Sequence, residues 1–180
     1  MKKATGNLEI DHEYILRLIG VMEKMVQVKS KNTDHFDKVV HVIKKYADGI
    51  HHAKEETLLF PLMAENGFSM KQGPLAVMLF DHNEGRAYVK GMVESITKYK
   101  EGNESALSKI YDNMLGYSDL LRNHIAKENN MLFRMADNAL SENDHQNLLM
   151  EFEKVETSNS YGGKISDYIY EIEKLESIYQ

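Results

Sequence analysis

The sequence contains no cysteine and only two prolines in 180 residues. Without cysteine the chain has no disulfide, no thiolate metal site, no iron–sulfur ligation and no cysteine nucleophile. Any metal that it binds must therefore be held by histidine, carboxylate and water. The scarcity of proline and the long stretches without turn signals favour an all-α fold.

Long apolar runs and an excess of positive charge are also missing. No run approaches the roughly 18 apolar residues of a membrane span, and the basic residues within positions 1–6 are not followed by the apolar core of a signal peptide. We therefore expect a cytoplasmic chain with no membrane partner. The net charge of −6 argues against a general nucleic-acid binder, and the length suits one domain with a sizeable core.

Apolar residues recur at helical spacing in six stretches of the chain. They predict helices over about residues 8–26, 34–60, 74–100, 104–137, 142–156 and 164–179. Pro61 lacks a backbone donor and should end or kink the second helix, before a plausible stop at residues 65–67.

The chain also repeats itself. Residues 51–60 and 124–133 share the pattern His-x-Ala-Lys-Glu-x-x-(Leu/Met)-Leu-Phe, and the dipeptide Asp11-His12 recurs as Asp81-His82. The first two helices therefore resemble the third and fourth. Two similar helical hairpins joined by short loops predict an up-down-up-down four-helix bundle.

We assign this bundle to residues 1–140. Residues 141–180 are expected to form a C-terminal helical extension that packs on the bundle. The alternative for the extension is a helix that binds a partner or mediates dimerisation.

Each repeat carries a histidine and a glutamate four residues apart, a spacing that puts both side chains on one face of a helix. Together with one histidine on each of the other two helices, they would form a single layer of the core. The candidate metal ligands are His12, His51, Glu55, His82, His124 and Glu128. Imidazole and carboxylate donors suit iron, manganese, zinc or cobalt without choosing among them. Two glutamates from parallel helices can each bridge two ions, which leaves two histidines for each ion and further positions for a bridging oxygen, water or a small ligand.

A choice must be made between His51 with Glu55 and His52 with Glu56, because both pairs have the same spacing. The repeat alignment selects His51 and Glu55. His52 and Glu56 are then expected beside the ligands or at the surface. His35, His41 and His145 fall off the apolar stripes and are expected at the surface.

A single histidine on an apolar face is more often a hydrogen-bonded core residue than a ligand. Four such histidines and two buried glutamates are harder to place without a metal, because an unpaired buried carboxylate is costly. The Glu-x-x-His pattern of the ferritin-like di-iron proteins is the poorer match, since here the histidine precedes the glutamate by four residues.

The order of the six residues resembles the hemerythrin-like family, also called the HHE cation-binding domain, over about residues 7–137. The motifs are His12 … His51-x-x-x-Glu55 … His82 … His124-x-x-x-Glu128, with Lys54-Glu55-Glu56-x-x-Leu59-Phe60-Pro61 and Gly73-Pro74-x-x-Val77-Met78. The resemblance implies a non-haem di-iron centre with an oxygen bridge and two bridging glutamates.

The sequence departs from the oxygen-carrying members of that family. They have a second histidine on the third helix, where this chain has Arg86 one turn after His82 and Met78 one turn before it. Their second bridging carboxylate is an aspartate, where this chain has Glu128. The pattern is closer to bacterial proteins that repair damaged iron centres, which usually carry an additional cysteine-containing module.

The main functional hypothesis is a non-haem di-iron protein that binds or senses O2 or NO at a carboxylate-bridged centre of two iron ions, with manganese or zinc as other metals. The alternatives are a di-iron enzyme acting on peroxide or NO, an iron-donating repair protein for damaged iron–sulfur centres, and a zinc-stabilised structural bundle. Tyr117, two turns before His124, either packs in the core or contributes to an open coordination position. A protein partner is not identified by the sequence.

Overall fold

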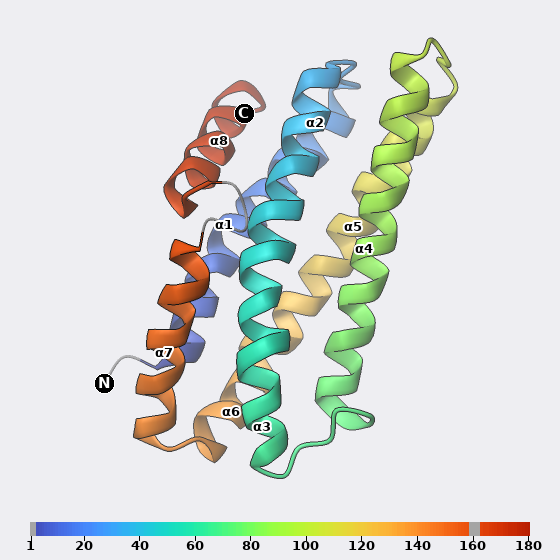
Figure 1. Ribbon diagram of the computed structural model, residues 1–180. Coiled ribbons are helices and arrows are strands. Elements are labelled where there is room, and N and C mark those ends of the chain that lie inside the picture. Colours follow the sequence, from blue (N-terminus) through green and yellow to red (C-terminus); the bar gives the residue numbers. More distant parts are fainter. Residues whose placement is uncertain (1–2, 159–162) are drawn as a thin grey trace.

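Four long helical rods form the body of the molecule and run alternately up and down, as predicted (Figure 1). The computed structural model describes residues 3–158 and 163–180, and the regular structure in these ranges is helical. The elements are α1 (Ala4–Gln27), α2 (Thr33–Val42), η1 (Ile43–His52), η2 (Glu55–Leu59), α3 (Phe60–Glu65), α4 (Gly73–Lys100), α5 (Ala106–Lys127), η3 (Glu128–Leu132), α6 (Phe133–Ala139), α7 (Glu142–Thr157) and α8 (Ile165–Ile178). Elements α2 to α3 form one continuous rod, and α5 to α6 form another.

Short loops join the rods where the sequence predicts them. Gly67 and Gly102 each have a φ angle of 96°, a left-handed conformation that glycine adopts without a steric penalty. Each glycine lies just past the end of a rod. The chain therefore reverses direction there, and neighbouring rods in the sequence are antiparallel neighbours in space.

Two of the rods contain π-helical turns, which the sequence analysis did not predict. These are η1 and η2 in the second rod and η3 in the fourth. The N–H of Phe60 donates to the carbonyl of Glu55, and the N–H of Phe133 donates to the carbonyl of Glu128. In both halves of the repeat, a π turn thus begins at the candidate glutamate ligand. Such turns are rare and are frequently found at functional sites.

Pro61, expected to end or kink the second helix, does not end it. The rod continues through it to Glu65, where Asn66 and Gly67 terminate it. Pro61 is the second residue of α3, directly after the π turn of η2. A missing N–H costs little at the start of an α-helical segment, where that group has no α-helical partner to lose.

The hydrophobic core is divided into two clusters. One includes Ile19, Val39 and Ile110, and the other includes Leu8, Phe60 and Phe133. The candidate histidines and glutamates lie between them along the rods. Each polar side chain therefore has apolar neighbours above and below, which exclude water from the layer.

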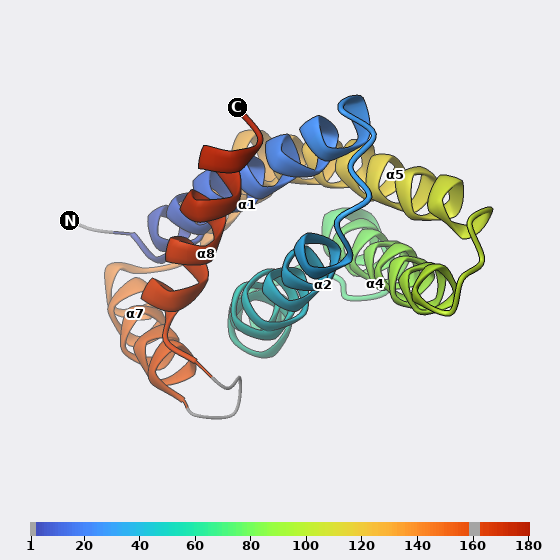
Figure 2. The ribbon, with the colours of Figure 1, turned by 90° about the horizontal axis from the view of Figure 1, so that it is seen from above.

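The C-terminal helices α7 and α8 both pack against α1, and α8 also contacts α2 (Figures 1 and 2). Phe152 of α7 and Ile172 of α8 are completely buried. These contacts agree with a helical extension that covers one side of the bundle, while the division at residue 140 stays a prediction. In the described part of the chain, no helix combines the length and the apolarity that crossing a membrane requires.

The prediction of surface positions is correct for His41 and wrong for His145. His145 is only 4% exposed, and its Nδ1 accepts a hydrogen bond of 3.3 Å from the N–H of Ala4. His35 is half-buried, with Nδ1 2.6 Å from the hydroxyl of Tyr179. The predictions failed because α7 and α8 supply a second buried surface outside the four-helix core.

Candidate metal centre

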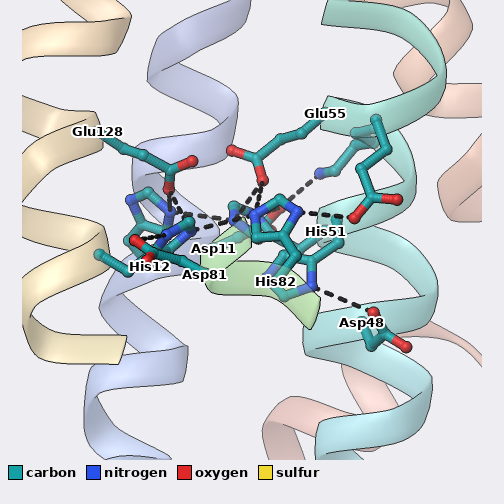
Figure 3. A network of polar contacts seen from close by, with 12 residues as sticks. Asp11, His12, Asp48, His51, Glu55, Asp81, His82 and Glu128 are labelled. Atoms are coloured by element: carbon teal, nitrogen blue, oxygen red, sulfur yellow. Dashed lines mark hydrogen bonds and ion pairs between the residues drawn. The ribbon is translucent and has the colours of Figure 1, made fainter. Parts of the chain in front are cut away.

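The six predicted residues meet in one buried layer, and Figure 3 labels His12, His51, Glu55, His82 and Glu128 among them. One histidine comes from α1, one histidine comes from α4, and each of the other two rods contributes a histidine and a glutamate. Each of the six is at most 1% exposed: His12, His51, Glu55, His82, His124 and Glu128. The structure therefore brings together every residue that the repeat selected.

The four histidines form two pairs. Nε2 of His12 lies 3.0 Å from Nε2 of His51, and Nε2 of His82 lies 3.2 Å from Nε2 of His124. Two imidazole nitrogens bound to one ion at about 2.1 Å and at right angles would be about 3.0 Å apart. The two pairs thus have the spacing of two ligands on a shared metal ion, once on each side of the layer.

Each glutamate approaches one histidine of each pair. Oε2 of Glu55 lies 3.6 Å from Nε2 of His51 and 3.4 Å from Nε2 of His82. Oε2 of Glu128 lies 3.2 Å from Nε2 of both His12 and His124. A carboxylate in this position can bridge two cations, one beside each histidine pair.

The outer nitrogen of every paired histidine faces an oxygen atom. Nδ1 of His51 is 3.2 Å from Asp11, and Nδ1 of His124 is 3.3 Å from Asp81. The other two rings face an amide and a glutamate: Oδ1 of Asn129 lies 2.7 Å from Nδ1 of His12, and Oε1 of Glu56 lies 2.7 Å from Nδ1 of His82. Donation from Nδ1 to these oxygens leaves Nε2 for a metal, and such partners fix the orientation of ligating histidines.

The two aspartates are themselves held by lysines in equivalent positions of the repeat. Lys54 contacts Asp11, and Lys127 contacts Asp81. Burial alone would raise the pKa of Asp11, but the hydrogen bond from His51 and the charge of Lys54 outweigh it and lower the pKa to about 2. Asp11 is therefore a carboxylate at neutral pH and a strong acceptor for His51.

The electrostatics of the layer favour a bound cation. Burial and the charge of Glu128 raise the pKa of Glu55 well above its ordinary value, because two buried carboxylates repel each other. Burial opposes ionisation of Glu128 as well, but His124 and His12 hold its pKa well below the usual range. None of the four carboxylate oxygens of these glutamates has a hydrogen-bond partner among the described residues. Such oxygens are costly to bury, and positive ions would compensate both of them.

Two histidines of the layer differ in charge at neutral pH, His51 being neutral and His124 protonated. Burial lowers the pKa of His51 to about 4. At His124, the carboxylates of Glu128 and Asp81 outweigh burial and raise the pKa to about 9. The layer thus keeps a proton where a metal ion would supply charge instead, and metal binding commonly displaces such protons. The donor set fits divalent ions of the iron, manganese, cobalt and zinc group.

His52, which the sequence placed beside the ligands or at the surface, lies buried beside them in this layer. It is 4% exposed, and its ring stacks on that of His82, with centroids 3.8 Å apart and planes 16° apart. Ligand atoms of His52, Glu55, His82 and His124 all lie within 4.8 Å of one another. The signals available were the His51-His52 doublet and Asp48 one turn earlier, which lies 3.2 Å from Nδ1 of His52.

The π-helical turns explain why His52 lies beside the ligands and not at the surface. It is the last residue of η1. A π-helix has more residues in each turn than an α-helix, because its hydrogen bonds join residues five apart. Consecutive side chains are then separated by a smaller angle, so His51 and His52 can both face the interior.

A cavity of about 350 Å³ lies beside the layer, on the side of His52. Its wall includes Ile43, Val89, Arg86 and Tyr117 as well as His52. Tyr117 is 3% exposed, and its contribution to the wall agrees with core packing next to the site. The wall combines aliphatic and aromatic side chains with charged ones such as Asp48, Arg86 and Glu94, and the apolar part suits a small uncharged molecule.

Comparison with known proteins agrees with the residue pattern. The model of the hemerythrin HHE cation binding domain matches residues 4–136. A probable iron-sulfur cluster repair protein of Haemophilus influenzae is 30% identical over 126 residues, which cover 67% of this chain and 56% of that protein. The iron-sulfur cluster repair proteins YtfE of Salmonella schwarzengrund and Salmonella newport are 29% identical over 125 residues, covering 63% of this chain and 56% of theirs.

The chain spans little more than half the length of these curated relatives. No solved structure matches it significantly. The family match covers the four rods and all six of the predicted ligand positions. On this evidence the chain belongs to the hemerythrin family, whose defining unit is the HHE cation-binding domain.

Proposed function

We propose that the protein holds two iron ions and supplies iron for the repair of damaged iron–sulfur centres. The observation that carries the two-ion part is the position of the glutamates, each of which approaches one histidine of both pairs. The repair part is supported by the relatives, whose names describe iron–sulfur cluster repair.

The absence of cysteine limits the role of this chain in repair to the supply of iron. Iron–sulfur clusters are held mainly by cysteine thiolates, and this chain has none. The damaged cluster therefore stays on a partner protein, and iron is the cargo that moves. Rebuilding a [4Fe–4S]²⁺ cluster from [3Fe–4S]⁺ consumes one Fe²⁺ and one electron, so a reductant must accompany the iron.

The test is iron transfer under anaerobic conditions. Protein loaded with ⁵⁷Fe²⁺ would be mixed with a [3Fe–4S] dehydratase and dithiothreitol, and the label and activity of the dehydratase would be followed. We expect label in the repaired cluster and a faster recovery than with the metal-free protein. Iron that stays on the loaded protein while free Fe²⁺ repairs the dehydratase would contradict the proposal.

Two variants make this test specific. Glu128→Gln keeps the size of the side chain but weakens its bridging, and should lose iron and the ability to transfer it. Glu142→Gln changes an exposed residue at the start of α7 and should transfer iron as the unmodified protein does.

The binding or sensing of O2 or NO is a second candidate function. The cavity beside His52 favours it, because an uncharged diatomic molecule could approach the layer along the apolar part of its wall. Anaerobic ferrous protein should then give a new, stable absorption spectrum on addition of one equivalent of NO. Sustained consumption of NO or peroxide that disappears in His51→Ala would indicate an enzyme instead.

A further inference from the structure

The two halves of the repeat differ in one group of polar residues. Asp48, His52, Glu56 and Arg86 form a connected cluster in which Arg86 binds both carboxylates. The equivalent positions in the other half are occupied by Leu121, Ile125, Asn129 and Leu16, in that order. One side of the layer is therefore surrounded by charge and imidazole where the other side has aliphatic packing and an amide.

His52 is held in the same manner as His51 and His124. Its Nδ1 lies 3.2 Å from Oδ1 of Asp48, and Nε of Arg86 donates to the same oxygen at 2.8 Å. An imidazole, a carboxylate and a cation thus follow one another outward from the layer in each of the three cases. This is the arrangement that orients a metal-binding histidine and leaves Nε2 free.

The free nitrogen of His52 has nothing to bind within the described protein. Nε2 is buried and has no hydrogen-bond partner among the described residues. A buried nitrogen without a partner carries a desolvation cost. A donor atom of His52 is also within 4.8 Å of those of Glu55, His82 and His124. The ring of His52 stacks on that of His82, with centroids 3.8 Å apart, so it lies beside the histidine pair that would hold one of the two ions and must turn for Nε2 to face that ion.

We propose that His52 is a fifth histidine ligand, for the ion held by His82 and His124. The proposal rests on the metal-binding function proposed above and extends it. One ion then has three imidazoles and the other has two, with the glutamates shared between them. The two metal positions are inequivalent, and the one on the His52 side binds more tightly.

A packing role would not require this arrangement. The equivalent residue in the second half, Ile125, fills its position with an aliphatic side chain that needs no polar partner. His52 instead carries a carboxylate and a guanidinium behind it. A water molecule in the adjoining cavity could satisfy Nε2 without any metal, and this is the rival arrangement that the experiment must separate.

The first measurement is proton NMR of the protein loaded with Co²⁺. Each coordinated imidazole that keeps its Nδ1 proton gives one exchangeable, strongly shifted N–H resonance. We expect five such resonances from the protein and four from His52→Ile, which introduces the residue of the other half. Four resonances in both proteins would overturn the proposal.

The second measurement is the affinity for Fe²⁺, by anaerobic competition with a chromogenic chelator. His52→Ile should lower the affinity for one of the two ions by about ten-fold to a hundred-fold or more and leave the affinity for the other nearly unchanged. His35→Gln, a change of a histidine far from the layer, should have no effect. Circular dichroism of the metal-free proteins would show that His52→Ile retains its helices.

The outcomes separate this proposal from the two-ion function. Two tightly bound ions in both the protein and His52→Ile would overturn the role of His52 and leave the function intact. A protein that binds a single ion would contradict the two-ion function. Weaker binding of that ion in His52→Ile would still support His52 as a ligand, and unchanged binding would overturn it.

Discussion

Asp11 accepts a hydrogen bond of 3.2 Å from His51 across two rods, and Asp81 stands in the same relationship to His124 at 3.3 Å. The repeat therefore includes the residues behind the ligands as well as the ligands themselves. Its two halves differ in their surroundings, because Lys54 beside Asp11 is completely buried whereas Lys127 beside Asp81 is 39% exposed.

We predict that Asp11→Asn and Asp81→Asn each weaken metal binding by about ten-fold to a hundred-fold, because each removes the charged partner of one histidine. Their effects on stability should differ. Asp11→Asn leaves the buried Lys54 with one carboxylate fewer and should cost about 3 kcal/mol of unfolding free energy, while Asp81→Asn should cost less. Metal competition and urea denaturation of the metal-free proteins would measure the two effects. Equal losses of stability would show that the burial of Lys54 is not the cause.

Removal of metal should lower thermal stability. The buried carboxylates and imidazoles lose their compensating charge, and an ion present at about 100 times its dissociation constant contributes about 2.7 kcal/mol. For a chain of this size that loses two such ions we expect a decrease in Tm of about 10 to 20 °C on chelation. Differential scanning calorimetry with and without chelator would measure it. Glu128→Ala should show little dependence on metal, and an undiminished dependence would place the bound ion elsewhere.

The packing of the C-terminal helices is open to a direct test. Phe152→Ala should destabilise the protein by about 3 to 4 kcal/mol, since the ring is completely buried against the bundle and would leave a cavity. Met150→Ala, two residues away and 56% exposed, should change stability by less than about 0.5 kcal/mol. Chemical denaturation of both variants is the measurement. A small effect of Phe152→Ala would mean that α7 is held only loosely on the bundle.

Access through the cavity can be tested by filling it. Val89→Phe places a larger side chain in the wall next to His52 and should slow the reaction of ferrous protein with NO several-fold, at an overpacking cost of about 1 to 3 kcal/mol. Stopped-flow absorption would give the rate. Val155→Phe on α7 serves as the control, because Val155 does not line this cavity. If both variants react as fast as the unmodified protein, NO reaches the layer by another route.

The bundle and its six central residues could be predicted because their signals are local and repeated. Apolar residues at α-helical spacing place His12 and His82 on the buried faces of their helices, and the two copies of one pattern align His51 with His124. An internal repeat also indicates which residues meet in space, because equivalent positions of the two hairpins come together if both hairpins contribute to one core. These inferences needed no knowledge of side-chain contacts.

The features that the sequence left open or placed wrongly have no local signal. His52 faces the interior because η1 is a π-helix, and the spacing of the apolar residues does not indicate a switch from α-helix to π-helix. His145 is buried by contact with α1, which lies far away in the sequence. Asp11 and Asp81 were recognised as part of the repeat, but their role follows only from their distance to rings on another rod.

The contact between Lys54 and Glu156 joins the C-terminal segment to the centre. The amine of Lys54 lies 2.8 Å from Glu156 of α7 and also contacts Asp11, whose carboxylate holds His51. An event at α7 that displaced Glu156 would alter the field at Asp11 and hence the basicity of His51. Linkage is reciprocal, so metal binding and the docking of α7 should favour each other by the same factor. A protein that binds α7 and draws it away from the bundle would thereby weaken the binding of iron at the centre.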